Sequence, residues 1–301
     1  MLLFPSMLDE QQDSEVVAPE LTERQQQEAE ERTSVSALVV HETIRYDGEE
    51  ELMRPVSALA WSGLAAGMSM GFSLVAMALF KAYLPDQPWA KLLVPLGYPL
   101  GFLIVIIGRQ QLFTENTLTA IIPLLARRNL STLLLVARLW AVVLAANMVG
   151  AHIFAWVVGN TPMFRADIQH AMFVLSMHAL DVTFGQAILR GIFAGWLIAM
   201  VVWMLAAVDN GRVVIIIILT YVVGLAGLTH IIAGAVEVLF SVMVGAKSWG
   251  AVAWGYLFPT LIGNIIGGVS LTAAINHAQV VSGMATKKQN HDEKQRKLPD
   301  R

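Results

Sequence analysis

The sequence of 301 residues has no cysteine and few charges, since 14% of its residues are Asp, Glu, Lys or Arg whereas 56% are hydrophobic. A soluble globular domain carries about 25% charged residues, so this composition excludes an ordinary soluble protein and indicates an integral membrane protein. The absence of cysteine excludes disulfide frameworks, thiolate metal sites and cysteine nucleophiles. The sequence also lacks a phosphate-binding loop, a metal-ligand cluster and a nucleophile–base pair, so we expect no enzyme, no cofactor and no nucleic-acid partner.

The charges are distributed unevenly along the chain. The first 57 residues carry 14 acidic and 4 basic side chains, and the remainder carries 9 acidic and 16 basic ones. Residues 1–34 are rich in Glu and Gln and cannot bury enough apolar surface to offset the entropy of ordering. We therefore expect a disordered acidic cytoplasmic tail that could recruit a cytoplasmic partner, and a polar cytoplasmic tail over residues 281–301.

Residues 55–280 form the predicted membrane domain, which contains six apolar stretches. The stretches are 56–80, 91–125, 130–159, 184–208, 213–244 and 251–275. Each is long enough for a hydrocarbon layer about 30 Å thick. Six crossings place both termini on one side, where seven basic residues in short loops outnumber four on the other side. This bias predicts a multi-pass protein of the bacterial inner membrane with cytoplasmic termini.

Two flanking segments carry further expectations. Residues 35–54 alternate apolar and charged positions, which indicates a short amphipathic helix on the membrane surface or on a partner, with Gly48 as a breaking point. Residues 160–183 are polar and are expected to form a connector.

The second and fifth stretches are predicted to be broken helices. The second is too long for one straight crossing at 1.5 Å per residue, and its centre, residues 109–116, is polar. The fifth contains His230 among Gly224, Gly227 and Gly234. An unsatisfied backbone group in lipid costs several kcal/mol, so such interruptions survive only where they are buried in protein or line a wet cavity.

The two halves of the membrane domain resemble each other. Thr114 precedes His230 by 116 residues, and Asn147 precedes Asn264 by 117. Three spans in each half would make the copies cross the membrane in opposite senses. The pattern therefore predicts an all-α inverted 3+3 repeat with one broken helix in each half and a site near the bilayer midplane.

The residues of the two breaks indicate a transport path. His230 is an ionisable group in the membrane interior, which makes it a functional candidate, and its reference pKa lies near neutrality. Thr114 supplies a hydroxyl, while the amides of Asn147 and Asn264 can tie the breaks in place. An apolar neck excludes a hydrated anion but admits a weak acid that is neutralised by a proton. The rings expected to narrow the path are those of Phe113, Tyr98 and Phe102.

Three motifs resemble those of the formate/nitrite transporter family. They read Leu112-Phe113-Thr114, Gly227-Leu-Thr-His230 and Ile262-Gly-Asn-Ile-Ile-Gly-Gly268. The resemblance covers residues 56–277 and implies an aquaporin-like six-helix protomer, a homopentamer with one pore in each protomer, and passage of small monovalent anions or their acids. It places Phe113, Thr114 and His230 in the pore directly, and Tyr98, Phe102, Leu112 and Val223 at constrictions by position.

Several departures indicate a divergent branch of that family. Thr229 and Gln111 stand where acidic residues are usual, Ala179 replaces the expected vestibule lysine beside His178, and Gly195 and Gly234 stand where asparagines are common. Arg109 takes the place of a small residue, and Glu115 follows the Leu-Phe-Thr motif. We expect these two charges to pair, because charges inside a membrane usually do, or else to change the ion selectivity.

The altered polar residues leave two other functions open. One is a pore for small neutral solutes. The other is a membrane scaffold or sensor with a vestigial pore, whose acidic tail recruits a partner.

Overall fold

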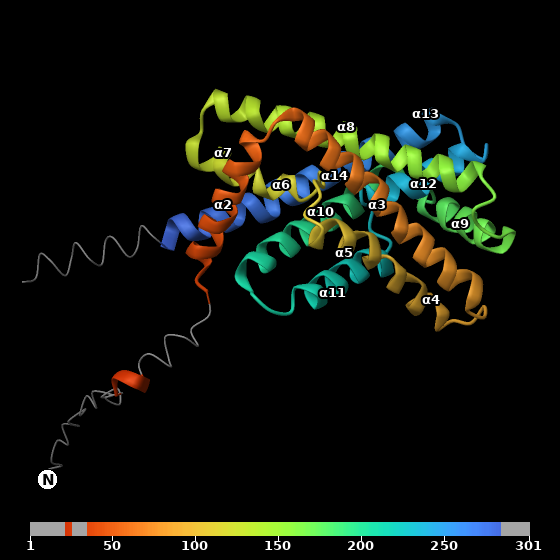
Figure 1. Ribbon diagram of the computed structural model, residues 1–301, viewed down its shortest axis with the longest axis horizontal. Coiled ribbons are helices and arrows are strands. Elements are labelled where there is room, and N and C mark those ends of the chain that lie inside the picture. The colour runs from red at the N-terminus through yellow and green to blue at the C-terminus, as the bar shows by residue number, and fades with distance from the viewer. Residues whose placement is uncertain (1–21, 26–34, 284–301) are drawn as a thin grey trace, which may run out of the picture. The chain divides into compact units, whose positions relative to one another are not determined.

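The computed structural model describes residues 22–25 and 35–283 (Figure 1). All regular secondary structure in residues 35–283 is helical, which confirms the predicted fold class at that level. Most of the acidic tail predicted for residues 1–34, and nearly all of the polar tail predicted for residues 281–301, lie outside the described residues. The partner of the acidic tail stays a prediction.

Five helical segments in the described part of the chain are long and apolar enough to cross a bilayer. The continuous ones are α3 (Val56–Tyr83), α8 (Leu130–Asn160) and α10 (Phe184–Ala207). The segment Ala90–Ile107 joins α4 (Ala90–Leu93), η1 (Val94–Gly97) and α5 (Pro99–Ile107). The segment Trp249–Gly283 contains α13 (Trp249–Val252), the π-helical η2 (Ala253–Leu257), α14 (Phe258–Ile266) and the π-helical η3 (Gly267–Ala274).

Four shorter helices lie next to the interruptions in the chain. They are α6 (Asn116–Thr119), α7 (Ile121–Arg127), α11 (Arg212–Leu225) and α12 (Ala233–Met243). Residues 233–241 of α12 are all buried, so this helix lies inside the protein. The pairs α5/α6 and α11/α12 flank the two stretches where the sequence predicts interruptions.

Side-chain caps set the starts of the long helices. The Asn129 carboxamide oxygen accepts a hydrogen bond from the Thr132 backbone N–H at 2.9 Å where α8 begins. Thr183 and Gln186 form a reciprocal capping box at the start of α10. These caps satisfy N–H groups that have no partner inside the helix, so each helix begins at a defined residue.

Small residues allow the long helices to pack backbone to backbone. The helix α3 lies along α8, and α10 lies along α14 (Figure 1). A methyl group at Gly67 would overlap the carbonyl of Asn147, and one at Gly195 would overlap the carbonyl of Asn264. Close approach of this kind is the main source of helix association in lipid, where apolar side chains gain little by leaving the solvent.

The helix α2 (Ala37–Met53) lies where a short helix was expected, and it corrects the expected breaking point at Gly48. It runs through Gly48 without interruption, because the missing side chain lets α2 press against the carbonyl of Thr119. The side chains of Val40 and Ile44 are buried in the protein body, so α2 packs on α6, α7, α8 and α10. The Arg138 guanidinium donates to the Leu52 carbonyl at 2.6 Å, at the carboxyl end of α2.

The expected polar connector over residues 160–183 contains a helix, α9 (Ala166–Ala179). Its buried residues Ile168, Ala171 and Met172 share one face, and α9 packs on α3 and α12. Because other residues of α9 are polar, the hydropathy of the sequence does not reveal this short apolar stripe.

The close approach at Gly195 predicts a position-specific effect of alanine. We expect Gly195→Ala to lower the stability of the detergent-solubilised protein by about 1–3 kcal/mol, because the added methyl forces α10 and α14 apart. Gly185→Ala in the same helix is the matched control, since a methyl there meets no atom within 4 Å. Thermal unfolding measures both, and equal melting temperatures would contradict the close packing.

Candidate functional site

Two interruptions with the same local design lie at the centre of the protein. The helix α5 ends at Ile107 and α6 begins at Asn116, while α11 ends at Leu225 and α12 begins at Ala233. Both stops use a helix-terminating turn in which a backbone N–H reaches back five residues. Gln110 N–H donates to the Val105 carbonyl at 2.9 Å, and Leu228 N–H donates to the Val223 carbonyl at 3.0 Å.

Each of these turns needs one residue with a left-handed backbone. Gly227 fills the position in the second turn with φ 60°, and Arg109 fills it in the first with φ 51°. Glycine adopts this conformation at no steric cost, whereas a side chain makes it unfavourable. The Arg109 side chain is exposed, which removes any conflict with neighbouring atoms.

Two buried asparagines hold the interruptions in the same way. The Asn147 oxygen accepts from Phe113 N–H at 2.9 Å, and its amide donates to the carbonyls of Gly63 and Gln111 at 2.7 and 2.9 Å. The Asn147 side chain thus satisfies three backbone groups, two of which lie in the interruption and have no helical partner.

The second asparagine repeats this pattern on the other half of the chain. The Asn264 oxygen accepts from Ile231 N–H at 2.8 Å, and its amide donates to the carbonyls of Gly191 and Thr229 at 2.8 and 2.9 Å. Phe113 therefore corresponds to Ile231. The correspondence of Thr114 with His230 expected from the sequence is wrong by two positions, because the amide bonds set the register.

Thr114 and His230 meet where the two breaks face each other. The Thr114 Oγ1 and His230 Nε2 atoms are 2.9 Å apart, and both residues are fully buried. The His230 Nδ1 atom faces the backbone N–H groups of Ile232 and Ala233, at 3.2 and 3.1 Å. Because those groups are donors, Nδ1 must be the acceptor, which assigns the imidazole proton to Nε2 and makes the Nε2–H the donor to Thr114.

Aromatic rings lead from this pair toward one side of the protein. The Phe102 ring lies edge-on to the His230 ring at 5.0 Å between centroids, and the Tyr98 ring follows Phe102 at 5.4 Å. Leu112, Phe113 and Val223 are also buried, and Phe113 packs on the Trp140 ring at 5.6 Å. The five predicted constriction residues are thus all buried, and two of them, Tyr98 and Phe102, form a series of rings that ends at His230; we call this apolar region the neck.

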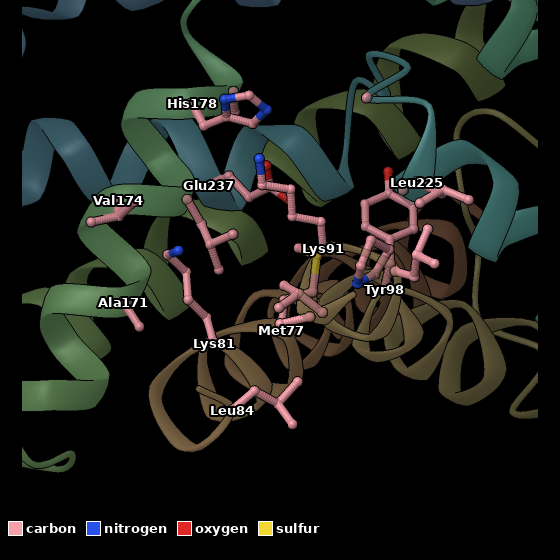
Figure 2. Close-up of a pocket in the computed structure, with 18 of the residues that line it drawn as sticks. Met77, Lys81, Leu84, Lys91, Tyr98, Ala171, Val174, His178, Leu225 and Glu237 are labelled. Atoms are coloured by element: carbon pink, nitrogen blue, oxygen red, sulfur yellow. The ribbon is translucent and has the colours of Figure 1, made fainter. Parts of the chain in front are cut away.

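A large cavity, lined by residues such as Met77, Lys81, Tyr98 and Glu237, reaches this neck (Figure 2). Its volume is about 1070 Å³, and it is lined at its inner end by Tyr98, Val223 and Thr229. The predicted residue His178 also lines it. Phe102, Thr114 and His230 are not among the cavity's lining residues and are fully buried, so the described residues form a closed neck beyond the cavity floor.

The expected pairing of Arg109 with Glu115 is wrong. In the described part of the chain Glu115 has no ion pair, and its buried Oε1 atom has no hydrogen-bond partner. The left-handed turn directs Arg109 to the surface, which separates the two charges.

Three residues that line the cavity were not predicted from the sequence. Glu237 in α12, Arg190 in α10 and Tyr256 in η2 all line it. Arg190 places a cation in a vestibule where Ala179 stands in place of the lysine of related motifs. Glu237 is a charged residue inside the apolar stretch 213–244, which is the signal that could have revealed it.

Comparisons with known proteins agree with this geometry. A family model described as Formate/nitrite transporter matches residues 38–278. The Inner membrane protein YfdC of Escherichia coli (strain K12) is 42% identical over 259 residues, which cover 86% of this chain and 84% of that protein. A solved "Pentameric formate channel with formate bound" has a TM-score of 0.58 at 23% identity and covers 82% of this chain and 98% of that one.

A second solved structure, described as an "FNT family ion channel", has a TM-score of 0.65 at 17% identity and covers 78% of this chain and 96% of that chain. At these identities the two structures are similar to this chain in fold alone.

The asparagine clamps predict a symmetric loss of stability. Asn147→Ala and Asn264→Ala each leave three buried backbone groups unpaired, and each such group costs about 1–3 kcal/mol. We expect both variants to unfold at clearly lower temperature in detergent. Asn160→Ala is the control, because the exposed Asn160 amide bonds only to the Trp156 carbonyl of its own helix. An unchanged melting temperature for either clamp variant would contradict its proposed role.

Proposed function

Because the chain belongs to the formate/nitrite transporter family, we propose that it is a transmembrane channel or transporter for small monovalent anions or their weak acids. The observation that carries this proposal is the Thr114–His230 hydrogen bond at the end of a deep cavity, enclosed by apolar side chains. A solute must shed its water to pass such a neck, and a hydroxyl and an imidazole N–H are the polar groups that can replace that water.

The neck favours a neutral acid over its anion. Its walls include Phe102, Leu112 and Val223, all fully buried, and an unpaired charge among such groups costs several kcal/mol. The amino end of α12 adds a partial positive potential beside His230 that attracts the acid's oxygen atoms. The permeant that fits these conditions is a small acid, formate- or nitrite-like, that crosses together with one proton.

His230 then couples transport to protons through its hydrogen bonding. With the imidazole proton on Nε2 and two backbone donors facing Nδ1, the ring is neutral and offers no charge to a bare anion. A neutral acid can donate its own proton to Thr114 Oγ1 while Nε2–H keeps its bond to that atom. The neck therefore admits the protonated solute in preference to the anion.

We further propose six membrane crossings arranged as an inverted 3+3 repeat with helices 2 and 5 broken. The matching asparagine clamps and the matching helix-terminating turns support this arrangement. Because the chain crosses the bilayer through buried breaks, the backbone polar groups there must be satisfied by protein.

The charges support an orientation with the α2 side in the cytoplasm. Arg127 pairs with Glu49 of α2 at 3.0 Å, whereas Lys81 and Lys91 line the cavity on the other side. The cavity then opens to the periplasm of a bacterial inner membrane. By analogy with the pentameric formate channel, we propose a homopentamer with one path in each protomer.

Uptake measurements in proteoliposomes test the proposed function. We expect the purified protein to admit formate at rates that increase as the external pH falls, because the neutral acid is the permeant. Glycerol and urea should enter no faster than into protein-free liposomes, since the neck selects small acids. Equal formate uptake with and without protein would refute the proposal, and fast glycerol or urea entry would favour a pore for small neutral solutes.

Substitution of the central ring tests its part in proton coupling. The asparagine in His230→Asn still offers an acceptor oxygen to the start of α12, so we expect an intact fold. The same side chain is too short to reach Thr114. The shortened side chain widens the neck for the hydrated anion, and the ratio of uptake between about pH 5 and about pH 7.5 should fall toward one. His152→Asn is the control, because the His152 ring lies against Trp249 at 5.4 Å and does not line the cavity. An unchanged pH ratio in His230→Asn would contradict coupling at this ring.

A further inference from the structure

The inner part of the cavity contains a buried carboxyl group without a partner. Glu237 is 9% exposed, and its side chain has no hydrogen bond or ion pair with any residue that the structure describes. The side chain lines the cavity from α12, the half-helix that begins just after His230 (Figure 2). An isolated carboxylate in such a place is costly unless it is neutralised by a proton or by a partner that enters from the cavity.

The surroundings of Glu237 direct this group toward the cavity. The elements that pack on α12 are α3, α8, α9 and α13. The helix α8 offers His152, which lies against Trp249 instead of lining the cavity, and α13 has no titratable residue. The Tyr256 phenol lies against α12 at Gly234, and the phenols of Tyr98 and Tyr256 are both close enough to Glu237 for an electrostatic interaction.

Several basic side chains also line the cavity. They are Lys81 at the end of α3, Lys91 in α4, His170 and His178 in α9, and Arg190 in α10. None of them forms an ion pair with Glu237 in the described part of the chain. These groups can attract an anion into the cavity without neutralising Glu237 beforehand.

The other acidic groups of the cavity lie at its outer part. Asp86 and Asp181 are exposed, and Asp167 pairs with Arg165 at 3.0 Å. Glu237 is the acid that faces the inner cavity from a buried position.

We propose that Glu237 transfers a proton to the small anion inside the cavity, before the solute enters the neck. The Glu237 O–H bond breaks and an O–H bond to the solute oxygen forms, so the anion becomes a neutral acid and Glu237 becomes a carboxylate. Cavity water then returns a proton from the bulk solution to Glu237. This inference rests on the proposed function, because it supplies the proton that the neutral acid carries through the neck.

The same step explains why a buried acid belongs at this depth. An anion drawn in by the lysines must be neutralised before it meets the rings of Phe102 and His230, and Tyr98 and Thr229 mark the end of the cavity. A carboxyl group within reach of the cavity solvent can be reloaded, which a group inside the closed neck could not. Glu237 is therefore a proton-transfer group of the transport path.

The test compares formate uptake by proteoliposomes containing wild type, Glu237→Gln, Glu237→Asp or the control Asp209→Asn. Glutamine has the same shape and stays neutral but cannot transfer a proton. We expect Glu237→Gln to reduce uptake at least about tenfold near pH 7, because positioned acids contribute roughly that much or more to proton transfer. The reduction should be smaller near about pH 5, where the bulk solution supplies about a hundred times more neutral acid.

The control and the conservative variant separate this role from a structural one. Asp209 is an exposed acid in the α10–α11 turn, and its loss should leave uptake and pH profile unchanged. Glu237→Asp keeps a carboxyl group, so it should retain part of the uptake near neutral pH that Glu237→Gln loses. If Glu237→Gln fails to fold, uptake by Glu237→Asp is the measurement that tests the inference. Failure of the aspartate variant to restore uptake would overturn the inference.

Two further outcomes would also refute the inference. Wild-type uptake with an identical rate and pH profile in Glu237→Gln would remove Glu237 from the path and leave the proposed function intact. If methylammonium inhibits uptake by the wild type but not by Glu237→Gln, Glu237 binds cations instead of transferring a proton. Absence of wild-type uptake above that of empty liposomes would instead refute the proposed function itself.

Discussion

The need to satisfy backbone polar groups inside an apolar body governs this structure. Each broken helix leaves N–H and C=O groups without helical partners, at a depth where water cannot reach them. Asn147 and Asn264 meet that need, because each bonds to two backbone groups within one interruption at once. The positions of Phe113 and Ile231 follow from these bonds, and so does the meeting of Thr114 with His230.

The clamps depend in turn on the small residues of the long helices. Asn147 can reach Gly63, and Asn264 can reach Gly191, because the paired helices approach closely enough for a side chain to bond to the opposite backbone. The close packing of the helices and the hydrogen bonds of the two asparagines thus depend on each other. A change in helix spacing would move the amide and release the break.

The protein combines a cavity lined by basic side chains with an apolar barrier at the neck. Lysine and arginine side chains in the cavity suit an anion, whereas the closed ring of apolar residues at the neck suits a neutral molecule. Under the proposed function, the solute gains a proton between these two regions. The neutral imidazole of His230 is held by Thr114 and by the start of α12, and Glu237 lines the cavity with its carboxyl group unpaired.

The sequence by itself determined the membrane class, the all-helical fold and the family, because hydropathy and local motifs depend on near neighbours in the chain. It also singled out Thr114 and His230, but only the tertiary structure shows that their side chains form a hydrogen bond. Only the tertiary structure decided which groups share a cavity. The left-handed turn separates Arg109 from Glu115, α2 packs on the body through Gly48, and α12 brings Glu237 to the cavity. These outcomes depend on contacts between residues far apart in the chain, and neither composition nor spacing records such contacts.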